Sequence, residues 1–207
     1  MLYTIVKTCC HMVFVDAYDG ESFGMQNIPK EGGFLIACNH ASFFDPAFAG
    51  GCISRPIYYF ARKSLFKGFL GWLLPRVHVI PVDRGEADFG AFKQVLTLLK
   101  KGKGVMVFPE GTRSPDGVLQ FAKKGIGMMA CKTGVPVVPT RIFGSYEIWG
   151  RQRKVPALTG SVKVVFGSPL MPQEIDPGEF AEDRYQVAAN RIMAAIAAIQ
   201  PPQNVIV

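Results

Sequence analysis

The chain has 207 residues, and its 49% hydrophobic and 19% charged content excludes a disordered protein and suits one domain with a full-sized core. Its formal net charge of +7 indicates an anionic partner, whether nucleic acid, anionic membrane or phosphate-bearing metabolite. The five cysteines lack CxxC spacing, which argues against a disulfide framework or a zinc site and indicates a cytosol-facing protein.

The N-terminal segment, residues 1–15, predicts an amphipathic helix. Its apolar residues recur at helical spacing, namely Leu2, Ile5, Val6, Cys9, Met12 and Val13. The polar residues of the opposite side are Thr4, Lys7, Thr8 and His11. The segment is shorter than the ~20 residues of a membrane-spanning helix and lacks the cleavage site of a signal peptide. Such a helix can lie on a membrane surface or pack on the domain, and the pattern leaves both open.

The remaining sequence alternates between apolar runs typical of strands and helical patterns. The predicted strands are Phe34–Asn39, Pro56–Ala61, Val77–Val82, Val105–Phe108, Val137–Ile142 and Ser161–Gly167, with a weaker one at Met12–Tyr18. Helical stripes cover Phe92–Leu99, Ile126–Ala130 and Glu179–Ile199. The sequence therefore predicts a single α/β domain over residues 1–207. Its central sheet, mostly parallel or mixed, should have about six or seven strands flanked by helices.

The first polar motif follows the strand predicted at Phe34–Asn39. His40 stands at the strand end, and Asp45 comes about one helical turn later. A carboxylate that holds one ring nitrogen of a neutral imidazole makes the other nitrogen an effective base. Taken alone, the pair can also be a polar strand terminus followed by a helix N-cap.

A second motif, Phe108–Gly117, follows the strand predicted at Val105–Phe108. Gly111 permits a sharp turn, and Arg113 offers a planar fork suited to phosphate. Arg84 follows another predicted strand, and Lys123 precedes the next helix. Cations at the ends of consecutive elements predict an anion-binding site.

These motifs resemble the 1-acylglycerol-3-phosphate acyltransferase family, within the wider glycerolipid acyltransferases. Four blocks stand in the order of that family, and the resemblance covers roughly Ile28 to Thr140. The blocks are Asn39-His40 with Ser42 and Asp45, the stretch from Gly71-Trp72 to Asp83-Arg84-Gly85, Phe108–Ser114, and Val135–Pro139.

The resemblance implies a role for each matching residue. His40 would be the general base and Asp45 the residue that orients it. The acceptor phosphate site would comprise Arg84, Glu110, Gly111, Thr112 and Arg113. Lys123 would match the family's lysine after the third block, although Ala122 stands where that lysine often follows the aromatic residue.

The implied reaction moves a fatty acyl group from acyl-CoA or acyl carrier protein to the sn-2 hydroxyl of 1-acylglycerol-3-phosphate, giving phosphatidic acid. No metal and no cofactor beyond the donor is expected. The apolar segment from Leu65 to Leu74, flanked by Lys63, Lys67 and Arg76, can touch a membrane or wall an acyl groove. We expect a peripheral protein at the cytoplasmic face of an anionic membrane, without a transmembrane span.

Other functions stay open at this point. A thioester hydrolase could use the same base with water, and a lipid-binding protein would need only the cations. Another lyso-lipid, such as an aminolipid, could replace the acceptor. Cys38, which shares a strand face with His40, could be a nucleophile, although a buried strand thiol is commoner. Nucleic-acid binding is not expected, because the cations are not interleaved with aromatic residues along one element.

Overall fold

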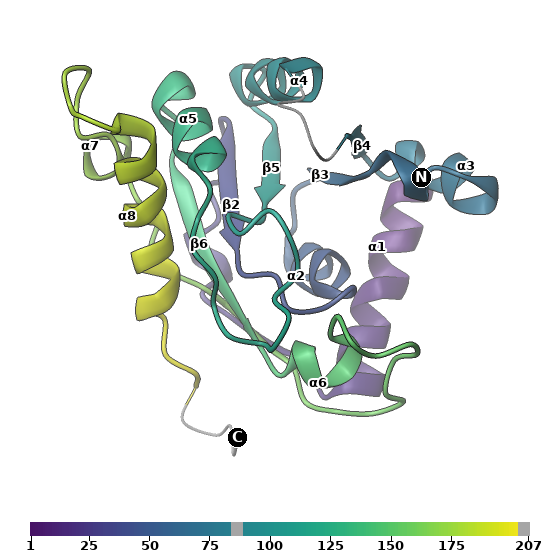
Figure 1. Ribbon diagram of the computed structural model, residues 1–207. Coiled ribbons are helices and arrows are strands. Elements are labelled where there is room, and N and C mark those ends of the chain that lie inside the picture. The colour runs from purple at the N-terminus through teal and green to yellow at the C-terminus, as the bar shows by residue number, and fades with distance from the viewer. Residues whose placement is uncertain (84–88, 203–207) are drawn as a thin grey trace.

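A computed structural model describes residues 1–83 and 89–202 of the protein. Within them a seven-stranded sheet has the order β1-β7-β6-β2-β5-β3-β4 (Figure 1). The strands are β1 Glu21–Phe23, β2 Phe34–Cys38, β3 Ile57–Arg62, β4 Val79–Val82, β5 Gly104–Val107, β6 Val137–Phe143 and β7 Lys163–Phe166. Only β6 and β7 pair antiparallel among these neighbours, so the predicted mixed sheet is confirmed.

Helices cover both faces of the sheet. They are α1 Leu2–Met12, α2 Asp45–Cys52, α3 Gly68–Arg76, α4 Phe89–Lys100, α5 Lys124–Thr133, α6 Ser145–Trp149, α7 Pro172–Ile175 and α8 Arg184–Ala198. In Figure 1, α4, α5 and α8 lie on one face, and α1 and α2 lie on the other. Among the described residues, no helix is long and apolar enough to cross a bilayer.

The central strand β2 is buried on both faces and divides the core. Phe34 and Ile36 belong to the cluster beneath α1 and α2, whereas Leu35 and Ala37 belong to the cluster beneath α4, α5 and α8. Successive side chains of a strand point to opposite faces, so a strand covered on both sides is apolar throughout. That is why this segment shows no alternation in the sequence.

Two predicted elements need correction. The strand predicted at Met12–Tyr18 is wrong, because the chain continues from α1 as a π-helix at Val13–Ala17. That turn places Phe14 and Tyr18 in the core against Phe48, with ring centroids 5.5 and 5.4 Å from it. Burial of two aromatic rings thus outweighs the strand propensity of the segment.

The last helix begins at Arg184, five residues later than the pattern predicted. Arg184 binds both carboxylate oxygens of Asp176, through Nε at 2.8 Å and Nη2 at 2.5 Å. A bidentate pair of this kind fixes the irregular segment before α8. The inward residues Ala188, Ile192 and Ile196 are fully buried, as the helical pattern indicated.

The parallel pairing of β2 with β5 positions the two polar motifs. Ala37 pairs with Val107, so the carboxyl ends of both strands lie side by side at one edge of the sheet. Polar loops that leave neighbouring parallel strands at such an edge commonly form the functional site of an α/β fold. The motifs that begin at His40 and Phe108 are therefore adjacent in space.

Candidate active site

His40 and Asp45 form a hydrogen-bonded pair between the end of β2 and the start of α2. Nδ1 of His40 lies 2.9 Å from Oδ2 of Asp45, whose side chain is fully buried. The carboxylate can only accept, so Nδ1 donates and Nε2 is left to accept a proton. Pro46 fits the first turn of α2, where its missing N–H costs nothing.

The Asp45 carboxylate is held by three further donors. Oδ2 accepts from the amides of Ala41 and Ser42, both at 2.7 Å. Oδ1 accepts from the Ser145 hydroxyl at 2.6 Å. Such a network satisfies a buried charge and fixes its orientation. The sequence did not predict a role for Ser145, at the first turn of α6, because a serine after a glycine forms no recognisable motif.

The His40 ring lies against Phe108, at the end of β5. The ring centroids are 4.0 Å apart, and the planes are inclined by 22°. The stack restricts rotation of the imidazole, and the bond to Asp45 selects its tautomer. Phe108 was quoted in the second motif without a role, and the structure gives it one.

Glu110 joins the two motif loops. Its Oε1 accepts from the His40 amide at 2.8 Å and its Oε2 from the Gln120 amide at 3.3 Å. Burial raises the pKa of this carboxyl to about 7, against the lowering effect of the two amides, and the charge of Asp45 adds to the rise. The Ser114 amide completes the connection by donating to the His40 carbonyl at 2.7 Å.

The structure brings three of the expected phosphate-binding residues beside this pair. Gly111 has φ +69°, a conformation that favours glycine. The Lys123 side chain packs close to it, because a Cβ atom added to Gly111 would lie only 3.0 Å from Cδ of Lys123. The Arg113 guanidinium carbon lies 3.4 Å from the centroid of the Phe43 ring, which belongs to the His40 loop. Thr112 is half-buried between them in the same turn. Arg84 lies outside the described residues.

Comparisons with known proteins agree with this geometry. A model of the family described as Acyltransferase matches residues 21–143. The chain belongs to the acyltransferase family. A 1-acyl-sn-glycerol-3-phosphate acyltransferase of Bacillus subtilis is 33% identical over 72% of each chain. A protein of Pseudomonas aeruginosa with the same name is 32% identical over 86% of this chain and 70% of its own.

A chloroplastic relative from Brassica napus, 1-acyl-sn-glycerol-3-phosphate acyltransferase BAT2, is 31% identical, and the alignment spans only 51% of its length. The crystal structure of the 1-acyl-sn-glycerophosphate (LPA) acyltransferase PlsC from Thermotoga maritima superposes with a TM-score of 0.76 at 27% identity. That match covers 97% of this chain and 81% of the other. The family and the fold predicted from the motifs are therefore confirmed.

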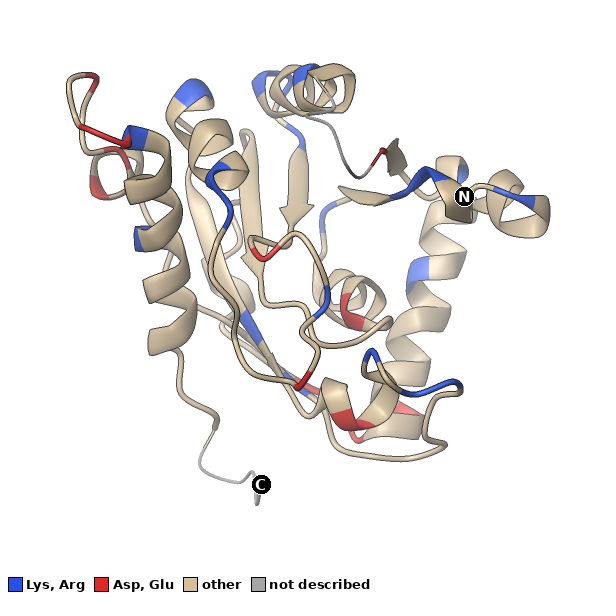
Figure 2. Ribbon diagram, in the orientation of Figure 1, with Lys and Arg blue, Asp and Glu red and all other residues tan. Residues whose placement is uncertain are grey.

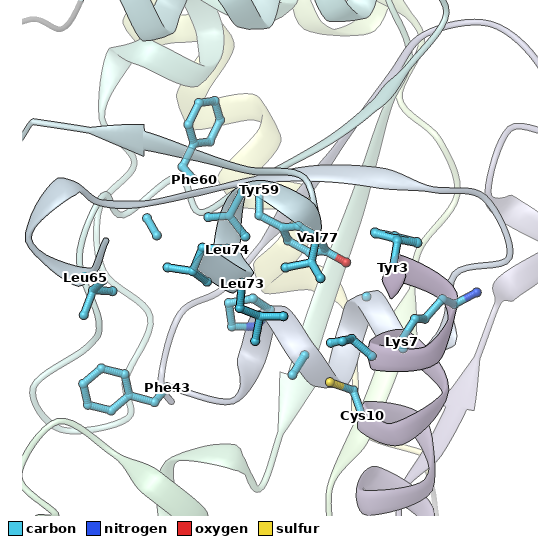
Figure 3. A pocket seen from close by; sticks show the side chains of 17 residues that line it. Tyr3, Lys7, Cys10, Phe43, Tyr59, Phe60, Leu65, Leu73, Leu74 and Val77 are labelled. Carbon is cyan, nitrogen blue, oxygen red and sulfur yellow. The ribbon is translucent and has the colours of Figure 1, made fainter. Parts of the chain in front are cut away.

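The acyltransferase has an apolar cavity of about 300 Å³ that begins at the loop carrying the His40–Asp45 pair, where Phe43 lines it (Figure 3). Phe43 and Pro46, which flank Asp45, line it at one end, and Tyr3 and Cys10 of α1 line it at the other. Further lining residues come from β3, the 3-10 turn Lys63–Leu65, α3 and the turn before β4, and include Tyr59, Leu65, Leu73, Leu74 and Val77. The cavity therefore runs away from His40 between α1 and α3.

The apolar segment at Leu65–Leu74 divides between the two roles that its sequence left open. Leu65, Leu73 and Leu74 line the cavity. Phe69 and Trp72, in contrast, are 70% and 48% exposed on the outer side of α3. One helix thus walls the cavity and presents aromatic side chains to the surroundings.

Cys38 does not qualify as a nucleophile. It is fully buried in β2. Burial raises the pKa of its thiol well above the usual value, and the charges of Asp45 and Glu110 raise it further. A buried neutral thiol lacks both access and reactivity, so it acts as an apolar core residue.

Proposed function

We propose that this acyltransferase transfers a fatty acyl group from an acyl thioester to the sn-2 hydroxyl of 1-acylglycerol-3-phosphate, giving phosphatidic acid. The observation that carries the proposal is the placement of the His40–Asp45 pair. Arg113 of the second motif and the apolar cavity both lie beside it, because Phe43 stacks on Arg113 and also lines the cavity. The acceptor phosphate, the reacting hydroxyl and the acyl chain would each meet groups of matching chemistry.

The chemistry is a single displacement at the thioester carbonyl. Nε2 of His40 accepts the proton of the acceptor hydroxyl while its oxygen attacks the carbonyl carbon. The tetrahedral intermediate collapses with cleavage of the C–S bond, and the imidazolium returns the proton to the leaving thiolate. Asp45 stabilises the imidazolium that exists between these steps. No acyl-enzyme is required, because a thioester is already activated.

The acceptor phosphate would be held by the turn at Gly111–Arg113 together with Lys123. Arg113 supplies a bidentate fork, and Gly111 lets the phosphate approach the main chain. Arg84 is expected to join them. Glu110 would act differently, because both its oxygens already accept from main-chain amides. We assign it the task of holding the two loops together. Binding of the phosphate then orients the hydroxyl toward His40.

The acyl chain would occupy the apolar cavity, with the donor either acyl-CoA or acyl carrier protein. We expect peripheral attachment to the cytoplasmic face of an anionic membrane. The outer side of α1 supports this, because Ile5 and Met12 are 52% and 56% exposed. Residues 1–15 would then lie on the membrane surface while the inner side of α1 walls the cavity.

The test is thiol release from acyl-CoA in the presence of lysophosphatidic acid, with mass spectrometry of the lipid product. We expect phosphatidic acid from the wild type and a loss of about 10⁴-fold or more in kcat for a folded His40→Ala variant. Wild-type turnover by that variant would refute the mechanism. A panel of lyso-lipids, including an aminolipid, tests the acceptor, and free fatty acid formed without an acceptor would indicate a hydrolase instead.

A further inference from the structure

The loop between α6 and β7, residues 150–160, combines positive charge with exposed apolar side chains. Its three cations are Arg151, Arg153 and Lys154, and it contains no acidic residue. All three are exposed, and none of them forms an ion pair within the part of the chain that the structure describes. Beside them, Val155 and Leu158 are 71% and 88% exposed. The proposed reaction uses none of these residues.

The 150–160 loop is fixed next to the cavity. Gly150 pairs with Ser42 in an isolated bridge, and the Phe43 amide donates to the Trp149 carbonyl at 3.2 Å. Phe43 itself lines the cavity. Farther along the loop, the Tyr18 hydroxyl donates to the Ala157 carbonyl at 2.9 Å, which ties the loop to the end of the N-terminal helical segment. The loop therefore stands at the cavity end near His40.

The other side of the cavity carries the same combination of side chains. Phe69 and Trp72 of α3 are exposed with their rings stacked at 5.9 Å, and Arg76 lies 4.7 Å over Trp72. Lys63 and Lys67 precede the helix. Figure 2 shows cations on α3 and on the loop after α6, on the same side of the molecule. Acidic residues gather around α7, on the opposite side, and another lies on α6, beside the loop.

We propose that the 150–160 loop and α3 together form a docking surface for an anionic phospholipid bilayer. Cations at the headgroup level attract the anionic lipids, while Val155, Leu158, Phe69 and Trp72 enter the boundary with the acyl chains. The cavity between them then opens at the depth from which a lipid substrate arrives. An acidic carrier protein would also satisfy the cations but would leave these apolar side chains in water. The inference rests on the proposed function, because it supplies the membrane partner of that same site.

The test compares vesicles of phosphatidylcholine with and without phosphatidylglycerol, using the full chain in a cosedimentation assay. The variant is Arg151→Gln/Arg153→Gln/Lys154→Gln. Its matched control removes three exposed lysines from α4 and the residue after it, at the top of Figure 1, as Lys93→Gln/Lys100→Gln/Lys101→Gln. We expect the loop variant to lose about a hundredfold in affinity for the anionic vesicles at low salt, and the control no more than about threefold.

A second variant, Val155→Ser/Leu158→Ser, keeps the charge and should lose about tenfold in affinity for the same vesicles.

Equal losses of affinity in the loop variant and the α4 control would overturn the proposal, because binding would then follow total charge. Unchanged vesicle binding with lost binding of acyl carrier protein would overturn it in favour of a donor-docking role. Transfer to a water-soluble, short-chain lysophosphatidic acid is measured in parallel. If that activity is absent while the loop still governs vesicle binding, the proposed function fails and the docking surface stands.

Discussion

Ser145 donates a 2.6 Å hydrogen bond to Oδ1 of Asp45 across 100 residues of sequence. The other carboxylate oxygen already accepts from His40 and two main-chain amides. The serine therefore fixes the half of the carboxylate that the local loop leaves open. In this way α6 helps to fix the carboxylate that holds the His40 ring at the end of β2.

The first prediction concerns Ser145→Ala. A hydrogen bond to a buried charge typically contributes about 1.5–3 kcal/mol, so we expect the free energy of unfolding to fall by about that amount. We also expect kcat to fall about tenfold, with little change in the acceptor KM, because orientation of the base matters mainly in the transition state. Urea unfolding and steady-state kinetics measure the two effects separately.

Ser161→Ala is the matched control. Its hydroxyl also donates to an aspartate, Asp19, at 3.2 Å, but that pair is exposed. We expect stability and kcat close to wild type for this variant. A wild-type kcat in folded Ser145→Ala would show that α6 has no part in positioning the base.

The contact between His40 and Asp45, and the position of the second motif, could be predicted from the sequence because each lies within one short loop. His40 and Asp45 are five positions apart, and strand ends deliver both loops to one sheet edge. Ser145 could not be found in this way, since its partner is 100 residues distant and no local pattern marks it. The cavity likewise joins segments from six elements, which a single sequence does not place together.

The orientation of α1 was also beyond the sequence. Its apolar pattern predicted Ile5 and Met12 on the same side as Val6, yet both are more than half exposed while Val6 lines the cavity. Lys7, assigned to the polar side, lines the cavity as well. A helix that is apolar over most of its circumference does not reveal which side packs, because tertiary contacts decide it.

The second prediction concerns the pH dependence of stability. Burial raises the pKa of Glu110 to about 7, above its value in the unfolded chain. Between about pH 5 and about pH 8 the folded state therefore binds more protons than the unfolded state, and stability falls as the pH rises. The contribution amounts to at most about 3 kcal/mol. Glu110→Gln should remove it, so that its unfolding free energy varies less over this range.

The measurement is urea unfolding of both proteins at several pH values. The informative quantity is the difference between wild type and Glu110→Gln, which cancels the other titrating groups. We expect the unfolding free energy of the wild type to fall relative to that of Glu110→Gln as the pH rises. A difference that stays constant across the range would contradict the raised pKa.

The third prediction tests the proposed phosphate-binding site with the Arg113→Lys variant. Lysine keeps the charge but loses the planar fork and the stacking on Phe43. We expect the KM for lysophosphatidic acid to rise about tenfold, and the KM for the acyl donor to stay within about twofold. Arg191→Lys, on the outer side of α8, is the control and should leave both constants unchanged. An equal rise in both constants for Arg113→Lys would point to a general distortion of the site.

The fourth prediction uses neighbouring cysteines of α1 to test where the acyl chain lies. Cys10 lines the far end of the cavity, whereas Cys9 is exposed on the outer side of the same helix. Cys10→Trp should fill that end, so kcat/KM for a palmitoyl donor should fall by about tenfold or more. An octanoyl donor, whose acyl chain is half as long, should be used almost as well as by the wild type. Cys9→Trp adds the same side chain outside the cavity and should leave the ratio of the two donors unchanged. Parallel losses for both donors in Cys10→Trp, at an unchanged melting temperature, would place the acyl chain elsewhere.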